Sequence, residues 1–122
     1  MSGNDFLLDT SVLIGFFAGR NEAHRLFTEN GIKITTIAVS QITRIELLSS
    51  SKLEAEEEAE IRSFLDRVRV IAISQDVEDF TITLRRQKRL KLPDALIVAT
   101  AIVHKLQLMT LDDAMLAVFE QL

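Results

Sequence analysis

Phe6-Leu7-Leu8-Asp9-Thr10-Ser11 is a short apolar run that ends at an acidic residue, and residues 12–17 then continue apolar toward Gly19. A short apolar run bounded by polar residues is typical of a buried strand, and the stretch after it predicts a helix. Asp9 therefore falls where a buried strand ends. In an open parallel sheet the carboxyl ends of the strands form the crevice in which ligands bind.

The rest of the chain repeats this alternation. Apolar runs predict further strands at residues 32–34, 70–73 and 106–110. Helical spacing and capping residues predict helices at residues 22–29, 38–49, 53–68 and 92–103. They also predict a helix that Asp76 caps and that reaches the basic segment before Pro93, and a short one that begins at Asp112-Asp113. Residues 95–103 are apolar on every side, so their helix should be central and buried. Strands that alternate with helices imply an α/β fold with a largely parallel sheet covered on both faces.

The composition predicts one compact domain. A chain of 122 residues that is 48% apolar can bury a real core. No cysteine occurs, which excludes disulfides, thiolate zinc sites and thiol nucleophiles and fits a reducing compartment, so we expect a cytoplasmic protein. The first residues carry no basic segment, and Asp9 interrupts the apolar stretch too early for a signal peptide or a membrane span. We therefore expect no membrane anchor.

The charges are unevenly distributed along the chain. A net charge of -4 argues against broad attraction to nucleic acid. Five acids nevertheless lie between Glu54 and Glu60, and a basic segment stands just before Pro93. Its members are Arg85, Arg86, Lys88, Arg89 and Lys91. Either run alone is explained by a solvated helix face.

Four acids stand at separated turning points of the chain: Asp9, Glu46, Asp94 and Asp112. Asp9 and Asp112 each follow a predicted strand on the ligand side of the sheet, and Asp94 begins a helix that could face the same crevice. Each Asp also has a structural explanation, because a carboxylate at a helix N-terminus accepts backbone N–H groups and complements the helix dipole.

Glu46 is less easily explained as a structural residue. It lies four residues after Ile42 and seven after Val39, which would place its carboxylate on the apolar stripe of the helix. A buried charge there would need a distant cation or a metal ion, because Arg44 points away. Alternatively, the long side chain reaches solvent at the edge of the stripe.

Convergence of the four carboxylates would favour a divalent cation. Carboxylates that lie close together repel one another and have raised pKa values unless a cation compensates them. Mg²⁺ and Mn²⁺ prefer such oxygen ligands, whereas His24 and His104 have no spacing for zinc. A cation held by carboxylates and water can activate water and neutralise a phosphodiester, which is nuclease chemistry. The sequence has neither a phosphate-binding P-loop nor a plausible acyl-transfer triad.

The acidic segments together resemble those of the PIN-domain ribonucleases, and in particular the VapC-type toxins of prokaryotic toxin–antitoxin pairs. The matching segments are Leu8-Asp9-Thr10-Ser11-Val12-Leu13-Ile14, Glu46 in its helix, Pro93-Asp94-Ala95-Leu96-Ile97 with Ala99-Thr100-Ala101, and Thr110-Leu111-Asp112. The resemblance spans the whole chain and implies a single PIN-like domain over residues 1–122. It also implies a doubly wound, mainly parallel sheet of four or five strands, a Mg²⁺ or Mn²⁺ site and endonucleolytic cleavage of RNA.

The resemblance further implies roles for individual residues. Asp9, Glu46, Asp94 and Asp112 would form the acidic site. Asp9 and Asp94 would be direct metal ligands, with Glu46 and Asp112 completing the cluster directly or through water. Hydroxyl positions that could hold metal-bound water or phosphate are matched by Thr10, Ser11 and Thr110. Similar proteins form homodimers and are silenced by a cognate VapB-type antitoxin whose C-terminal segment wraps the toxin and blocks the site.

Asp113 follows Asp112 directly, and we favour Asp112 as the fourth acid because it lies two residues after Thr110. The tail lacks the aromatic residue often seen soon after the fourth acid, which leaves the local geometry open. The basic segment leads to Asp94, and we expect four of its members to guide RNA phosphates. These are Arg85, Arg86, Lys88 and Arg89.

Two other functions fit the same fold. One is a non-catalytic protein- or RNA-binding module that keeps the acids as caps and salt-bridge partners. The other is a housekeeping PIN nuclease in RNA processing. The placement of Glu46 on an apolar face favours an enzyme over a binding module.

Overall fold

A parallel sheet forms the centre of the computed structural model, which describes residues 5–87 and 89–122. Its strands are β1 Phe6–Leu8, β2 Ile37–Ser40, β3 Arg69–Ile71 and β4 Gln107–Met109. They lie in the order β3-β2-β1-β4, and each neighbouring pair is parallel. The predicted α/β fold with a parallel sheet is confirmed.

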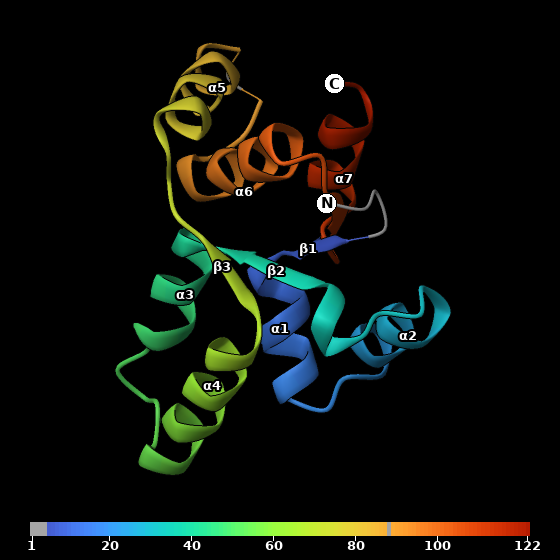
Figure 1. Cartoon of the computed structure of the whole chain (residues 1–122), viewed down its shortest axis with the longest axis vertical. Coiled ribbons are helices and arrows are strands. Elements are labelled where there is room, and N and C mark those ends of the chain that lie inside the picture. The colour runs from blue at the N-terminus through green and yellow to red at the C-terminus, as the bar shows by residue number, and fades with distance from the viewer. Residues whose placement is uncertain (1–4, 88) are drawn as a thin grey trace.

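Helices cover both faces of the sheet (Figure 1). On one face lie α1 Thr10–Phe17, α2 Asn21–Glu29, α3 Gln41–Leu48 and α4 Ala55–Arg67. On the other face lie α5 Gln75–Arg86, α6 Leu92–Val103 and α7 Asp113–Glu120. The sheet is therefore doubly wound. No helix in the described ranges has both the length and the apolar character that crossing a membrane requires.

The strand order creates a switch point at the centre of the sheet. The chain runs outward from β1 through β2 to β3 and then returns to place β4 on the other side of β1. The connections that leave β1 and β4 therefore diverge at the carboxyl ends of these two strands. In doubly wound sheets this is where ligands bind.

The core has two halves, which β1 separates. Leu7 packs into one cluster of buried side chains together with Val98 of α6, and Leu8 packs into the other with Leu13 of α1. Both leucines are fully buried, because neighbouring residues of a strand point to opposite faces and both faces are covered. The predicted central helix is confirmed, since most of the residues from Ala95 to Ala101 in α6 are buried.

Two predicted elements near Glu46 were wrong. The strand expected at residues 32–34 is replaced by a 3-10 turn at Ile34–Thr36, and the strand lies at Ile37–Ser40. The helix expected over residues 38–49 begins only at Gln41, where the Ser40 hydroxyl accepts the Ile42 N–H at 3.2 Å. Pairing of β2 with β1 and β3 explains the difference, because it gives the backbone of this apolar stretch partners on both sides. The other predicted elements are present with ends shifted by a residue or two.

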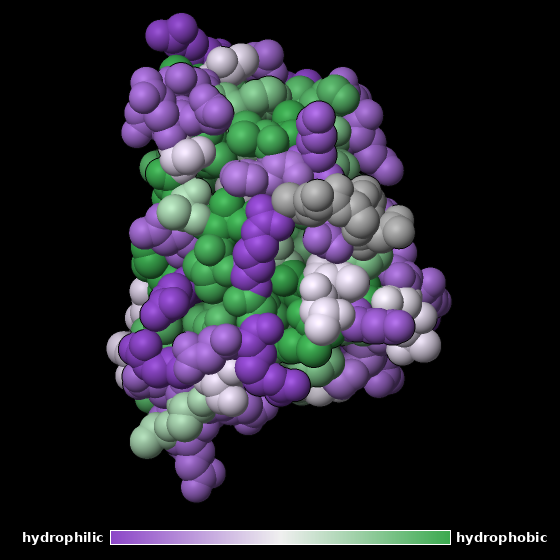
Figure 2. Space-filling view, viewed as in Figure 1, coloured by the Kyte–Doolittle hydropathy of each residue, from purple (hydrophilic) through white to green (hydrophobic). Residues whose placement is uncertain are grey.

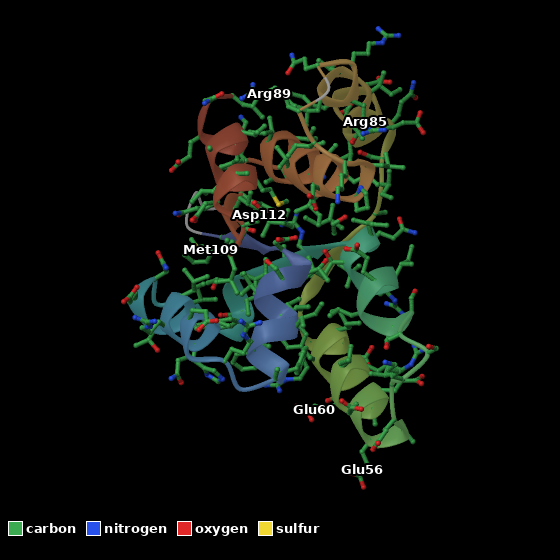
Figure 3. All side chains as sticks on the ribbon, turned by 180° about the vertical axis from the view of Figure 1, so that it is seen from behind. Glu56, Glu60, Arg85, Arg89, Met109 and Asp112 are labelled. Carbon is green, nitrogen blue, oxygen red and sulfur yellow. The ribbon has the colours of Figure 1, made fainter. Side chains whose placement is uncertain are left out.

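The two charged runs lie at opposite ends of the molecule (Figure 3). Glu56 and Glu60 of α4 lie at one end, Arg85 and Arg89 at the other, and Asp112 between them. On the face shown in Figure 2, apolar side chains gather across the middle of the molecule, and hydrophilic side chains are prominent at both ends.

Candidate functional site

The four predicted acids come together at the carboxyl edge of the sheet. Asp9 follows β1, Glu46 projects from α3, and Asp94 lies in the first turn of α6. Asp112 follows β4 and precedes α7. Burial is the main cause that raises the pKa of Asp94 above its usual value, and three carboxylates add to it in the order Asp9, Asp112, Glu46. The other three acids are thus close enough to act on Asp94, and among the described residues Lys91 acts on it in the opposite direction.

Asp9 is buried and held by hydroxyl groups. Its backbone N–H donates to the carbonyl of Met109 at 2.8 Å, which ties the end of β1 to the end of β4. Its Oδ2 accepts hydrogen bonds from Ser11 and Thr110, both at 2.8 Å. The side chain makes no capping bond to α1. Asp9 is therefore oriented across the switch point, and capping does not explain it.

Asp112 has a structural role as well as a place beside the other acids. Its Oδ1 caps α7 by accepting the Met115 N–H at 3.0 Å, as the capping explanation expected. Its own N–H donates to Thr110 Oγ1 at 3.0 Å. Asp112 contributes to the raised pKa of Asp94, and Asp113 does not. Asp112 is thus the acid that faces the cluster.

Glu46 lies at the edge of the buried surface and not within it, contrary to the expected apolar stripe. Because α3 begins at Gln41, its buried residues are Thr43 and Leu47, and Glu46 is exposed. Its Oε1 accepts a hydrogen bond of 2.7 Å from the Thr10 hydroxyl. That hydroxyl also lies 3.1 Å from the Thr43 hydroxyl, a residue that the sequence patterns did not single out. In the sequence, the feature that points to this contact is a small polar residue one helical turn before Glu46.

The three hydroxyl residues predicted to hold water or phosphate hold carboxylates in this structure. Ser11 and Thr110 donate to Asp9, and Thr10 donates to Glu46. Ser11 Oγ also accepts the N–H of Leu111 at 3.3 Å, which joins the loop after β4 to α1. These hydroxyl groups therefore orient the acids.

Asp94 differs from the other three acids. It is half-buried, and among residues 5–87 and 89–122 it receives no hydrogen bond. The ion pairs found in that part of the chain join Arg20 to Glu22 and Arg62 to Glu58, so no cation there pairs with any of the four acids. Among the described residues, the charge gathered at this edge is therefore offset by no ion pair, although the charge of Lys91 acts on Asp94.

The donor set fits a hydrated Mg²⁺ or Mn²⁺ ion better than a fully protein-bound one. Among the described residues, no three acidic or histidine side chains are placed so that they could hold a metal ion together. Mg²⁺ commonly keeps several waters and needs only one or two carboxylates. Asp9, Glu46 and Asp112 each engage one carboxylate oxygen with the protein, and the described residues donate no hydrogen bond to the other.

A basic hollow is formed by residues that precede Asp94 in the chain. Arg85, Arg89, Leu90 and Lys91 line an open hollow of about 470 Å³. The Arg85 guanidinium donates to the Leu90 carbonyl at 2.9 Å, and Arg89 donates to the side chain of Gln121. Lys91 connects the hollow to the acids, because its charge acts on Asp94. Of the other predicted RNA-binding residues, Arg86 is exposed on the last turn of α5, and Lys88 lies outside the described residues.

Residues 6–120 match the family model of the PIN domain, and the chain therefore belongs to the PIN-domain family. A solved toxin–antitoxin complex from Klebsiella pneumoniae contains a similar chain with 37% sequence identity and a TM-score of 0.76. That match covers 88% of this chain and 87% of the other. The resemblance to PIN-domain proteins of toxin–antitoxin pairs is thereby confirmed.

Two more distant structures share the fold. FitAcB from Neisseria gonorrhoeae is 20% identical, with a TM-score of 0.72 and coverage of 94% of this chain and 93% of that one. DNA-bound VapBC from Salmonella typhimurium is 21% identical, with a TM-score of 0.65 and coverage of 84% and 82%. No curated protein matches the sequence.

The raised pKa of Asp94 predicts how stability depends on pH. The folded protein binds a proton at Asp94 more readily than the unfolded chain, so this group favours folding below the usual Asp pKa. That contribution is lost as pH rises through the raised pKa. We expect Asp94→Asn, which cannot ionise, to be more stable than wild type at neutral pH without metal, and the difference to disappear in acid.

Urea unfolding in EDTA at neutral and acidic pH would measure this difference. Asp113→Asn is the control, because Asp113 is an exposed acid in a first helical turn and does not act on Asp94. A loss of stability in Asp94→Asn at neutral pH would instead mean that the Asp94 carboxylate stabilises α6 by interacting with its helix dipole.

Proposed function

We propose that this chain is a metal-dependent endoribonuclease and the toxin of a VapBC-type toxin–antitoxin pair. The observation that carries the proposal is the gathering of four carboxylates from four separate parts of the chain at the switch point, with no ion pair to them among the described residues. Membership of the PIN-domain family and the 37% identity to a chain of a toxin–antitoxin complex support it. The proposal includes a single PIN-like domain over residues 1–122 and a cytoplasmic location.

Asp9 and Asp94 are the proposed direct ligands of Mg²⁺ or Mn²⁺. Asp9 is held by two hydroxyl groups and leaves its Oδ1 without a described donor, and Asp94 receives no hydrogen bond from the described residues. Glu46 and Asp112 complete the cluster directly or through water. A bound divalent cation supplies neutralisation of the phosphodiester charge and activation of water.

The non-catalytic module is the weaker proposal. It needs the acids as helix caps and salt-bridge partners, but among the described residues only Asp112 of the four caps a helix with its side chain, and none forms a salt bridge. Asp9 is held by hydroxyl groups at the end of a strand. Burial and the three neighbouring carboxylates raise the pKa of Asp94, so its ionised form is disfavoured. A housekeeping nuclease would share the chemistry, and the similarity to a chain of a toxin–antitoxin complex favours the toxin.

We propose that the antitoxin binds in the apolar groove beside Glu46. It has a volume of about 320 Å³ and lies between α1, α3 and α4. Its apolar lining includes Ile14, Phe17, Leu47, Leu53 and Ile61, and Glu46 and Glu57 add carboxylates. An apolar segment with a basic residue would match this lining in both polarity and charge. A VapB-type segment in the groove would reach the acidic site at Glu46, and a homodimer remains part of the prediction.

Metal-dependent RNA cleavage is the first expected outcome. Purified, antitoxin-free protein should cut a mixed RNA pool with Mg²⁺ or Mn²⁺ and stop when EDTA is added. Asp9→Asn and Asp94→Asn should each lower the rate by at least about 100-fold, since changes to outer partners of a metal alone cost about 10- to 100-fold. Gel analysis of the RNA measures this, with Asp113→Asn as the active control. Cutting that persists in EDTA would contradict the proposal.

The basic segment should bind RNA phosphates. Replacing Arg86 and Arg89 by Gln should weaken binding of a single-stranded RNA and lower its salt slope by about one unit for each lost phosphate contact. Binding is measured in EDTA at several salt concentrations, in the Asp94→Asn background so that no cleavage occurs. Arg25→Gln, an exposed change on α2, is the control. An unchanged salt slope would show that Arg86 and Arg89 do not contact RNA phosphates.

The groove should bind the antitoxin through Ile14. This side chain is 55% exposed although it is apolar, and it lines the groove. Ile14→Asn should weaken binding of the cognate antitoxin by about 1 kcal/mol or more, roughly a fivefold loss of affinity. Ile82→Asn is the matched control, because Ile82 is 44% exposed on α5 outside the groove. Equal affinities of the two variants would place the antitoxin elsewhere.

A further inference from the structure

Thr43 is a buried hydroxyl residue with no part in the proposed reaction. It lies on α3 one turn before Glu46, and it is 0% exposed. Its Oγ1 lies 3.1 Å from Thr10 Oγ1, which in turn lies 2.7 Å from Glu46 Oε1. The three side-chain oxygens thus form a row that leads from the interior of the protein to an exposed carboxylate.

The chemistry of the groups fixes the direction of the hydrogen bonds in this row. A threonine hydroxyl has one proton to donate, and an ionised carboxylate can only accept. Thr10 therefore donates to Glu46, which is also its shorter contact. The proton between the two hydroxyl groups must then come from Thr43.

Other buried helical threonines use their hydroxyl groups differently. Thr81 and Thr100 each donate to the carbonyl four residues earlier in the helix, both at 2.7 Å. This is the usual local bond of a helical threonine. Thr43 makes no such bond within the described residues, and its hydroxyl contacts α1 instead. The Thr43 hydroxyl is therefore oriented by its contact with Thr10 and not by a bond within its own helix.

We propose that Thr43 is a positioning residue that holds the Glu46 carboxylate toward the other acids through Thr10. Hydrogen bonds in a chain polarise one another, so the donor to Glu46 is a stronger one when Thr43 donates to it. Glu46 is exposed, and without this anchor its long side chain would sample many rotamers in solvent. This inference rests on the proposed metal-dependent function.

Removing the Thr43 hydroxyl should impair the site without a change of shape. We expect Thr43→Val to lower the rate of RNA cleavage and the affinity for Mn²⁺ by about tenfold each, the lower end of the effect of outer partners of a metal. Thr43→Ser keeps a donor and should restore both. Thr81→Val is the matched control, because it removes a buried helical hydroxyl that donates only to its own helix.

A double-mutant cycle tests whether Thr43 acts through Thr10. In the Thr10→Val background, Thr43→Val should cause little further loss of Mn²⁺ affinity, because the anchor of Glu46 is already gone. Thr81→Val should have the same small effect in either background. Calorimetric titration with Mn²⁺ alone measures these affinities without RNA.

The outcomes separate the inference from the proposed function. If wild type cleaves RNA and binds Mn²⁺ but Thr43→Val equals Thr81→Val in both, the positioning role is refuted. If wild type does neither, the proposed function fails, and the ¹³C shift of the Glu46 carboxyl group decides the positioning role. A shift that moves in Thr43→Val but not in Thr81→Val supports it, and one that moves in neither refutes it.

Discussion

The hydrogen bonds at Asp9 are the interaction on which the rest of the site depends. Its N–H joins β1 to the Met109 carbonyl of β4, and its buried carboxylate accepts the hydroxyl protons of Ser11 and Thr110. Thr110 also accepts the N–H of Asp112, so the first acid sets the position of the fourth. Buried polar groups are costly to leave unpaired, and this network therefore favours one arrangement of the two strand ends.

The same arrangement is electrostatically unfavourable without a ligand. Asp94 is held beside three other carboxylates, and its raised pKa records the combined effect of burial and their charges. The ion pairs Arg20–Glu22 and Arg62–Glu58 are on the surface and include none of these acids. A fold selected for stability alone would neutralise or separate such charges, whereas sites that bind cations commonly retain them.

Local patterns predicted the parallel sheet, the central helix and the positions of three of the four acids, whereas the surroundings predicted for Glu46 were wrong. Asp9 directly follows β1, Asp112 lies in the short loop after β4, and Asp94 lies in the first turn of a helix marked by Pro93, so the local pattern was sufficient. The surroundings of Glu46 were wrong because the start of α3 depends on where β2 stops pairing with its neighbours. The contact between Thr10 and Thr43 joins residues 33 positions apart, which no periodicity reports. The proposed roles of the individual acids remain predictions.

Two of the four acids, Asp9 and Asp112, come from opposite ends of the chain. The hydrogen bond from Thr110 to Asp9 spans 101 positions, and β4 completes the sheet beside the strand that was made first. Contacts this distant in sequence form late, because the intervening chain must be ordered before they can contribute. During synthesis, therefore, a chain that has not yet released its final strand cannot assemble the acidic cluster. The four acids can therefore meet only after the last strand has taken its place beside the first.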